Sequence, residues 1–136
     1  MLARLVGLIL AVAALVPAPA RALTIERVKS PGGIEAWLIQ DRSAPIIALH
    51  AGFAGGSAQD PKGKDGIANL LASMLDEGAG PYDSQAFQGK LENLSIEFSA
   101  EADRDRFYVG MRMLADRRDE AVDMLAVALA EPRFEA

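Results

Sequence analysis

The sequence predicts an α+β domain: a mostly antiparallel sheet with helices packed on one face. Three kinds of pattern point to this class. Alternating apolar and polar residues indicate strands, apolar residues three and four positions apart indicate helices, and two turn signals between strands indicate hairpins. The expected order is three strands, two helices, two strands and a helix.

The first three predicted strands lie before residue 55. Residues 24–29 and 34–40 flank Pro31-Gly32-Gly33, which is typical of a hairpin turn. Residues 46–53 are apolar and include β-branched side chains, which predicts a central, buried strand.

Residues 66–80, GIANLLASMLDEGAG, predict an amphipathic helix that Gly78 should stop. Apolar residues at i, i+3, i+4, i+7 and i+8 should bury one face. These residues are Ile67, Leu70, Leu71, Met74 and Leu75. The opposite, polar stripe is Asp65, Asn69, Ser73, Asp76 and Glu77.

The last three elements follow Asp83, which is placed to cap a second helix. Phe87, Leu91 and Leu94 share one face of that helix. Alternation then predicts two strands joined by a turn at 103–105, with inward residues Ile96, Phe98, Ala100, Phe107, Val109, Met111 and Met113. A third helix, 117–130, ends before Pro132. Its expected inward residues are Ala121, Val122, Leu125, Ala128 and Leu129.

The polar stripe of the helix in 66–80 has the spacing of a zinc site without its ligands. An inverted zincin motif needs two imidazoles four residues apart and a carboxylate beside them as general base. The chain carries Asn69, Ala72 and Ser73 at those positions. A neutral amide and a hydroxyl are poor zinc ligands, and a methyl group accepts no proton. The motif is degenerate, and we expect no catalytic or metal-binding residue in it.

With its flanking glycines, this segment resembles the Gly-x-x-His-x-x-Glu-His-Met-x-x-x-Gly motif of the M16 peptidases, the family of insulinase, pitrilysin and the processing peptidases. The resemblance covers roughly residue 23 to the end of the chain. It implies a partial M16/LuxS-like metallohydrolase domain, with 23–136 as its N-terminal portion and the C-terminal remainder absent. It also implies that zinc is the cofactor of active relatives and that this chain has none.

Two functions follow from the resemblance. In the first, the protein is a catalytically inactive homologue that binds peptide segments and pairs with an active M16 peptidase subunit. In the alternative, it belongs to an active zinc-dependent metalloendopeptidase whose catalytic residues lie elsewhere or use unusual ligands. The first is favoured, because losing a general base alone typically costs about two to four orders of magnitude in rate.

Other candidate sites are weaker. His50, the only histidine, lies in an apolar strand and is expected to be packed or hydrogen-bonded rather than a ligand. Asp76 and Glu77 could join Asn69 and Ser73 in a weak oxygen-lined cation site. The competing interpretation is that these carboxylates are simply solvated.

The first 22 residues resemble a secretory signal peptide. Arg4 supplies the positive region, residues 5–16 the apolar region, and Ala20-Arg21-Ala22 a small-x-small cleavage site. This predicts a protein exported to the periplasm or the extracellular space, with a retained N-terminal anchor as the competing interpretation.

Charge and cysteine content exclude several classes of function. Beyond residue 22, 12 basic residues face 19 acidic ones, a net charge of −7. That balance argues against nucleic acid and against anionic membranes as partners. The chain has no cysteine, which excludes disulfides, thiolate metal sites and lipoprotein attachment.

We predict cleavage after Ala22, because the small-x-small site follows the apolar region directly. N-terminal sequencing of exported protein should begin at Leu23. A chain that keeps Met1 and stays in the membrane fraction would contradict the prediction and support the anchor.

Overall fold

A computed structural model describes residues 24–134, which belong to two compact units separated after Arg42. The predicted signal peptide, 1–22, lies outside the described residues. The first unit is an antiparallel hairpin of β1 (Ile25–Lys29) and β2 (Glu35–Ile39), as the turn signal predicted. Gly33 at its turn has a φ of 87°, a conformation that favours glycine. Every residue of both strands is exposed.

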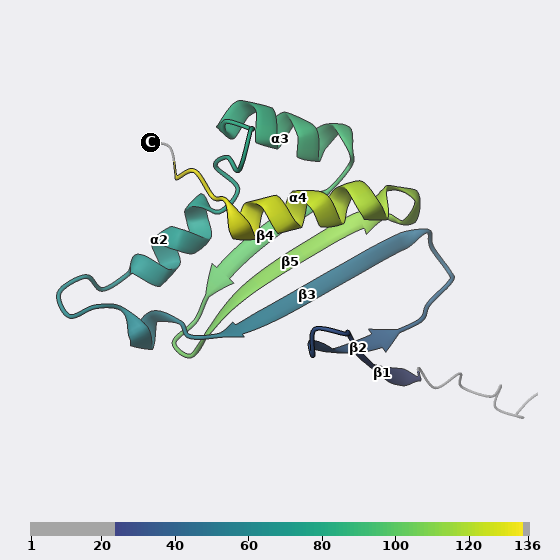
Figure 1. The fold of residues 1–136 in the computed structure, drawn as a ribbon, viewed down its shortest axis with the longest axis horizontal. Helices are drawn as coiled ribbons and strands as arrows, with labels where there is room; N and C mark the ends of the chain where they lie inside the picture. Colours follow the sequence, from purple (N-terminus) through teal and green to yellow (C-terminus); the bar gives the residue numbers. More distant parts are fainter. Residues whose placement is uncertain (1–23, 135–136) are drawn as a thin grey trace, which may run out of the picture. The chain divides into compact units, whose positions relative to one another are not determined.

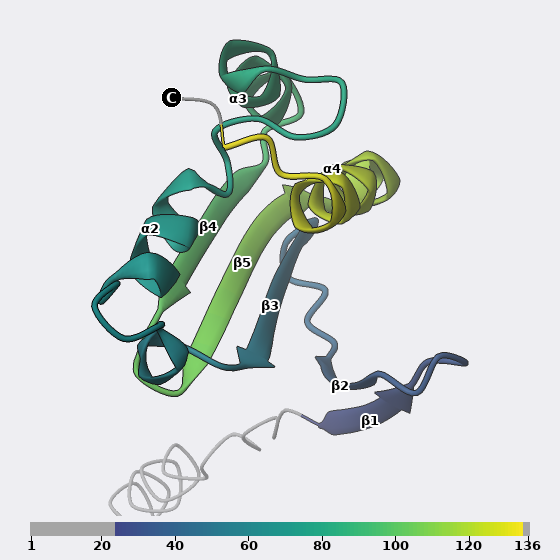
Figure 2. The ribbon, with the colours of Figure 1, turned by 60° about the vertical axis from the view of Figure 1, so that its left-hand side comes forward.

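The second unit contains a three-stranded antiparallel sheet in the order β3-β5-β4, with helices on one side of it (Figures 1 and 2). The strands are β3 (Ile46–Ala54), β4 (Glu97–Ala102) and β5 (Arg106–Leu114). The helices are α2 (Ile67–Met74), α3 (Ser84–Asn93) and α4 (Arg118–Ala130), and short 3-10 turns occupy Ser57–Gln59 and Ala115–Arg117. The element order and the α+β class are those predicted from the sequence.

The core of this unit lies between β5 and the helices. Val109, Met111 and Met113 of β5 are buried, each on the face that alternation predicted. Phe87 and Leu91 of α3 pack in the same cluster, also as predicted, and Leu94 is half-buried. β5 is the central strand of this sheet, since it pairs with β3 on one side and with β4 on the other.

The prediction that 46–53 forms a central, buried strand is wrong in one respect. Residues 46–54 do form strand β3, but in the sheet of the second unit β3 is an edge strand, paired there with β5. None of its residues is fully buried. Local composition indicates how apolar a strand is, whereas its position in a sheet depends on pairing with distant segments.

Helix α4 buries a narrower face than predicted. Ala121, Leu125 and Ala128 are buried, and Met124 completes their i, i+3, i+4, i+7 stripe. Val122 and Leu129, predicted to face inward, are about 40–45% exposed. They follow Ala121 and Ala128 by one position, a 100° rotation that carries them to the flank of the helix.

The turn between β4 and β5 is organised by Asp103. Its carboxylate accepts hydrogen bonds from the backbone N–H groups of Asp105 and Arg106, both at 2.7 Å. These bonds, that of Asp105 first, lower the pKa of Asp103 below its ordinary value of 3.8. A lowered pKa in the folded state stabilises the fold above the unfolded pKa. That contribution is lost as the pH falls through the folded value.

We predict that Asp83→Ala destabilises the domain by about 0.5–2 kcal/mol. The Asp83 carboxylate accepts a hydrogen bond from the backbone N–H of Ala86 at 2.8 Å and caps α3, and alanine cannot replace it. Urea unfolding measures the loss. Asp83→Ser is the matched control, because a serine hydroxyl can accept the same bond, and equal losses in the two variants would contradict the capping role.

Candidate functional site

Helix α2 carries the degenerate motif, and a remote carboxylate caps its first turn. The helix begins after Gly66, whose φ of 98° favours glycine. Asp60 accepts hydrogen bonds from the backbone N–H groups of Gly66 (2.6 Å) and Ala68 (3.0 Å). A carboxylate at this position also interacts favourably with the helix dipole. Sequence reasoning missed this role, since Asp60 lies seven residues before Ile67, the first residue of the helix, in a polar loop.

The buried face of α2 differs from the predicted apolar stripe. Leu75 is buried as expected, but Ile67, Leu70 and Leu71 are exposed, Leu70 to 58%. The helix packs along β4 instead with Ala72 buried and Ala68 half-buried (Figure 2). Alanine side chains allow a helix to approach a strand closely, so the larger apolar residues lie to the side. The helix also ends at Met74, before the predicted stop at Gly78.

The three motif positions have different environments. Asn69 and Ser73, one helical turn apart, are exposed on the same side of α2. The Ser73 hydroxyl donates a hydrogen bond to the backbone carbonyl of Leu70 at 2.9 Å. Ala72 is only 7% exposed. Two of the positions therefore keep the orientation of a surface site, while the third is part of the packing against the sheet.

The carboxylates at the end of α2 bind to α3. Asp76 accepts a hydrogen bond from the side-chain amide of Gln88 at 3.0 Å, and Glu77 accepts one from the Ser84 hydroxyl at 2.6 Å. Both residues are half-buried, and these bonds tie two helices together. Across 24–134, no three His, Asp or Glu side chains come together in a group that could hold a metal ion.

The segment that follows α2 connects it to the other two helices. Ala79 is fully buried between Gly78 and Gly80, whose φ angles of 111° and 52° favour glycine. Ala79 forms isolated bridges with Tyr82, before α3, and with Pro132, after α4. A Cβ on Gly80 would lie 2.8 Å from Cγ1 of Val127 on α4, so glycine is also required for space.

His50 lies on the face of the sheet away from the helices. It alternates with Leu49, which packs toward the core, and its ring stacks on Tyr108 with centroids 5.6 Å apart. One face of the His50 ring is thus packed, as predicted, but the residue as a whole is exposed. His50 is on the opposite side of the sheet from the helix layer and cannot join Asn69 and Ser73.

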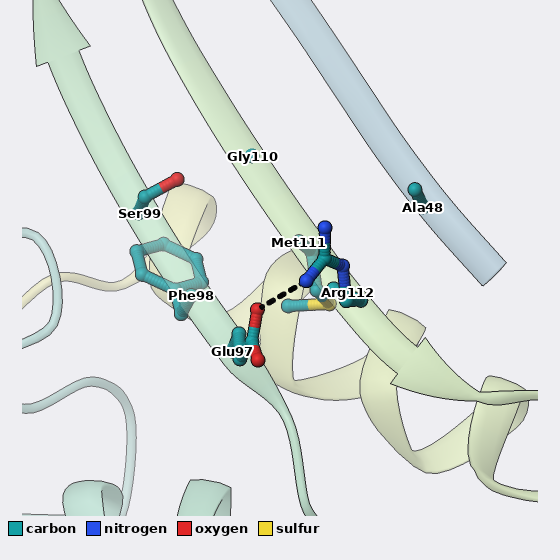
Figure 3. Close-up of a pocket in the computed structure, with 7 residues that line it drawn as sticks. All are labelled: Ala48, Glu97, Phe98, Ser99, Gly110, Met111 and Arg112. Carbon is teal, nitrogen blue, oxygen red and sulfur yellow. Dashed lines mark hydrogen bonds and ion pairs between the residues drawn. The ribbon is translucent and has the colours of Figure 1, made fainter. Parts of the chain in front are cut away.

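The same open face has a hollow of about 380 Å³ above Gly110 (Figure 3). Arg112 and Glu97 form an ion pair at 3.2 Å on one side of it, and Ser99 and Ala48 border it from the two outer strands. These charged side chains already neutralise each other. The hollow belongs to the sheet surface and not to the site on α2.

The residues present do not fit a zinc ion. Asn69 and Ser73 have no imidazole, thiolate or carboxylate, and Ala72 has no group that could take a proton from water. Asp76 and Glu77 already accept hydrogen bonds from α3. No hydrolytic step can be derived through a metal at these positions.

Fold and site together define a metallohydrolase-like α+β domain whose motif helix retains the spacing but not the chemistry of a zinc site. The chain belongs to the family described as insulinase (peptidase family M16), whose model matches residues 37–136. The resemblance deduced from residues 66–80 is thereby confirmed.

Similar proteins include members described as inactive. The "non-peptidase homolog YmxG" of Helicobacter pylori is 28% identical over 90 residues, which cover 66% of this chain and 21% of YmxG. The peptidase M16 inactive domain from Pseudomonas fluorescens superimposes with a TM-score of 0.76 and 29% identity, over 84% of this chain and 28% of that one. A protease from H. pylori shares the fold, with a TM-score of 0.70 and 15% identity, over 84% of this chain and 27% of its own. The chain spans roughly a quarter of each relative.

We predict that Ala72→Glu destabilises the domain by about 3 kcal/mol at pH 7, because it places a carboxylate in a packed position. Burial raises the pKa of such a carboxyl in the folded state. The variant then loses stability as the pH rises above the pKa of this carboxyl in the unfolded state. Its loss of unfolding free energy, relative to the parent protein, should therefore grow between pH 4 and pH 7.

Urea unfolding at both pH values measures the effect. Ala72→Gln has the same size without the charge and should show no growth of the deficit with pH. Asn69→His, at an exposed position, should change stability by no more than about 0.5 kcal/mol. An Ala72→Glu variant as stable as the parent would show that the position is open.

Proposed function

We propose that this chain is part of a catalytically inactive M16 homologue, exported from the cytoplasm, that binds peptide segments and acts as the non-catalytic partner of an active M16 subunit. The observation that carries the proposal is the motif helix: its frame is kept, both zinc-ligand positions hold neutral side chains, and Ala72, at the position of the base, is buried. The similarity to a non-peptidase homolog and to an inactive M16 domain supports it.

The edge of β4 supports a peptide-binding role. In the sheet of the second unit, as far as residues 24–134 describe it, β4 pairs with β5 on one side only, and α2 packs along it. Asp103 N–H donates to the carbonyl of Arg106 at 2.9 Å, and hydrogen-bonded pairs alternate along an antiparallel ladder. The backbone groups of Phe98, Ala100 and Ala102 therefore point away from β5. They are available to an extended peptide that adds as a further strand.

Side chains around this edge suit transient binding rather than permanent pairing. Glu97 and Glu101 of β4 are exposed charges, and charges on an edge strand discourage uncontrolled association. Ile67 and Leu70 of α2 are exposed apolar residues that could receive the side chains of a bound peptide. A strand edge of this kind would hold a peptide without cutting it.

The N-terminal signal pattern supports export, and the acidic balance supports protein rather than nucleic acid partners. No helix in the described part of the chain is long and apolar enough to cross a membrane. An active partner would be recognised by an intact His-x-x-Glu-His motif in a chain that purifies together with this one.

We predict that the mature protein does not hydrolyse fluorescein-labelled unfolded casein, with or without added zinc, but binds it. Mass spectrometry of the casein tests hydrolysis, and fluorescence anisotropy tests binding. Metal-dependent cleavage that survives purification to homogeneity would contradict the proposal and support the zinc-peptidase alternative.

Ala100→Pro should weaken casein binding by about 2- to 10-fold, because it removes one outward N–H group from the β4 edge. It leaves the β4–β5 ladder intact, since that N–H does not point to β5. Ala100→Ser keeps the N–H and is the matched control. Unchanged binding in Ala100→Pro would show that the peptide does not use this edge.

A further inference from the structure

The loop before α2 contains the one Asp-Gly sequence of the chain, at Asp65 and Gly66. In such a sequence the backbone nitrogen of the glycine can attack the aspartate side chain, because the product is a five-membered succinimide ring and glycine has no side chain to shield its nitrogen. Gly66 keeps this access in the folded protein. Apart from its chain neighbours, no heavy atom lies within 4 Å of the place where a Cβ on Gly66 would be.

The Asp65 side chain has no contact that would hold it away from this nitrogen. The residue is exposed, and within residues 43–134 its carboxylate has no hydrogen-bond or ion-pair partner. Other aspartates of this unit are held in place: Asp83 caps α3, and Asp103 organises the turn between β4 and β5. Asp65 can therefore turn toward Gly66 without breaking a bond.

The nitrogen of Gly66 is in contact with a base. Its N–H donates a hydrogen bond to Oδ2 of Asp60 at 2.6 Å, and Oδ1 of the same carboxylate accepts one from the N–H of Ala68 at 3.0 Å. The second bond fixes the orientation of the carboxylate. A group within hydrogen-bond reach of the proton that must leave meets the geometric requirement for a general base. The carboxylate that caps α2 is therefore also placed to activate the Gly66 nitrogen.

We propose that Asp65 is a site of spontaneous isomerisation to isoaspartate, with the Asp60 carboxylate as the general base. The Gly66 nitrogen attacks Cγ of the protonated Asp65 carboxyl group while its proton passes to Asp60. Asp60 then returns the proton to the departing hydroxyl group, which leaves as water, and the succinimide is formed. Water opens this ring at Cγ to restore aspartate, or at the α-carbonyl carbon to give isoaspartate.

The modification changes the start of the motif helix. The succinimide nitrogen has no hydrogen, so the bond from Gly66 to Asp60 is lost when the ring closes. Isoaspartate then carries its Cβ in the backbone, which lengthens the chain by one atom between Asp60 and α2. The fraction of isoaspartate should increase with the age of the protein, and with it the fraction of molecules in which the first turn of α2 is uncapped.

Incubation of the mature protein in neutral buffer tests the proposal. Proteolysis and electron-transfer fragmentation measure isoaspartate at residue 65, and labelling by an L-isoaspartyl methyltransferase counts it independently. Isoaspartate should form about 10-fold faster in the folded protein than in the urea-unfolded protein, where Asp60 is no longer held on Gly66. Asp65→Glu is the negative control, because glutamate would have to close a six-membered ring. A folded protein that isomerises no faster than the unfolded one would overturn the proposal.

Asp60→Asn separates the base from the cap. The asparagine carbonyl oxygen accepts the hydrogen bond but does not take the proton, so isomerisation in the folded state should slow by about 100-fold. In urea the variant and the parent should react at equal rates. Asp116→Asn, at an exposed position outside this loop, is the matched control and should change neither rate.

An equal or higher rate in folded Asp60→Asn would overturn the proposal, because the hydrogen bond would then restrain Gly66 rather than activate it. Circular dichroism and the urea midpoint show whether the variant keeps its helices. If it does not fold, the comparison of the folded with the unfolded parent protein decides the question.

Discussion

The burial of Ala79 between two glycines is the constraint on which the geometry of the site depends. This residue pairs with Tyr82 on one side and Pro132 on the other, and so connects the ends of α2, α3 and α4. Hydrogen bonds from Gly80 N–H to Glu131 C=O (2.9 Å) and from Arg133 N–H to Gly78 C=O (3.0 Å) reinforce the junction. Ala79 is fully buried, and a side chain at Gly80 would meet Val127. The direction of α2 is therefore set by local packing and not by a metal ion.

The packing around α2 explains how the helix keeps its position although the zinc ligands and the general base are absent. Asp60 holds the first turn of α2, the Ala79 junction holds its end, and Gln88 and Ser84 hold Asp76 and Glu77. None of these contacts uses Asn69 or Ser73, whose positions are free to vary as far as the fold is concerned. Position 72 is different, because its methyl group lies in the packing between α2 and β4. The zinc site is thus absent at three positions. Asn69 and Ser73 are uncharged surface residues, and Ala72 is part of the packing between α2 and β4.

Much of the fold followed from the sequence, because the signals for it are local. The cap at Asp83, the turn at Asp103 and the alternation of Val109 and Met111 are each decided within a few residues, and all are observed. Burial that depends on distant partners was predicted less well. The buried face of α2 differs from the predicted apolar stripe, because the periodicity alone does not show that Ala72 packs against β4. The composition of β3 predicted an interior strand, and the described residues leave it at an edge. The candidate site could be predicted from the spacing of Asn69, Ala72 and Ser73 alone, whereas the burial of Ala72 depends on how α2 packs against β4.

The central claim is that α2 retains the residue spacing of an inverted zincin motif but cannot bind zinc. The most direct measurement is anomalous diffraction at the zinc absorption edge from crystals of the mature protein grown with excess zinc chloride. The account predicts no anomalous peak within coordination distance of Asn69 and Ser73. A peak there at ligand distances of about 2.0–2.3 Å, present at full occupancy, would contradict it.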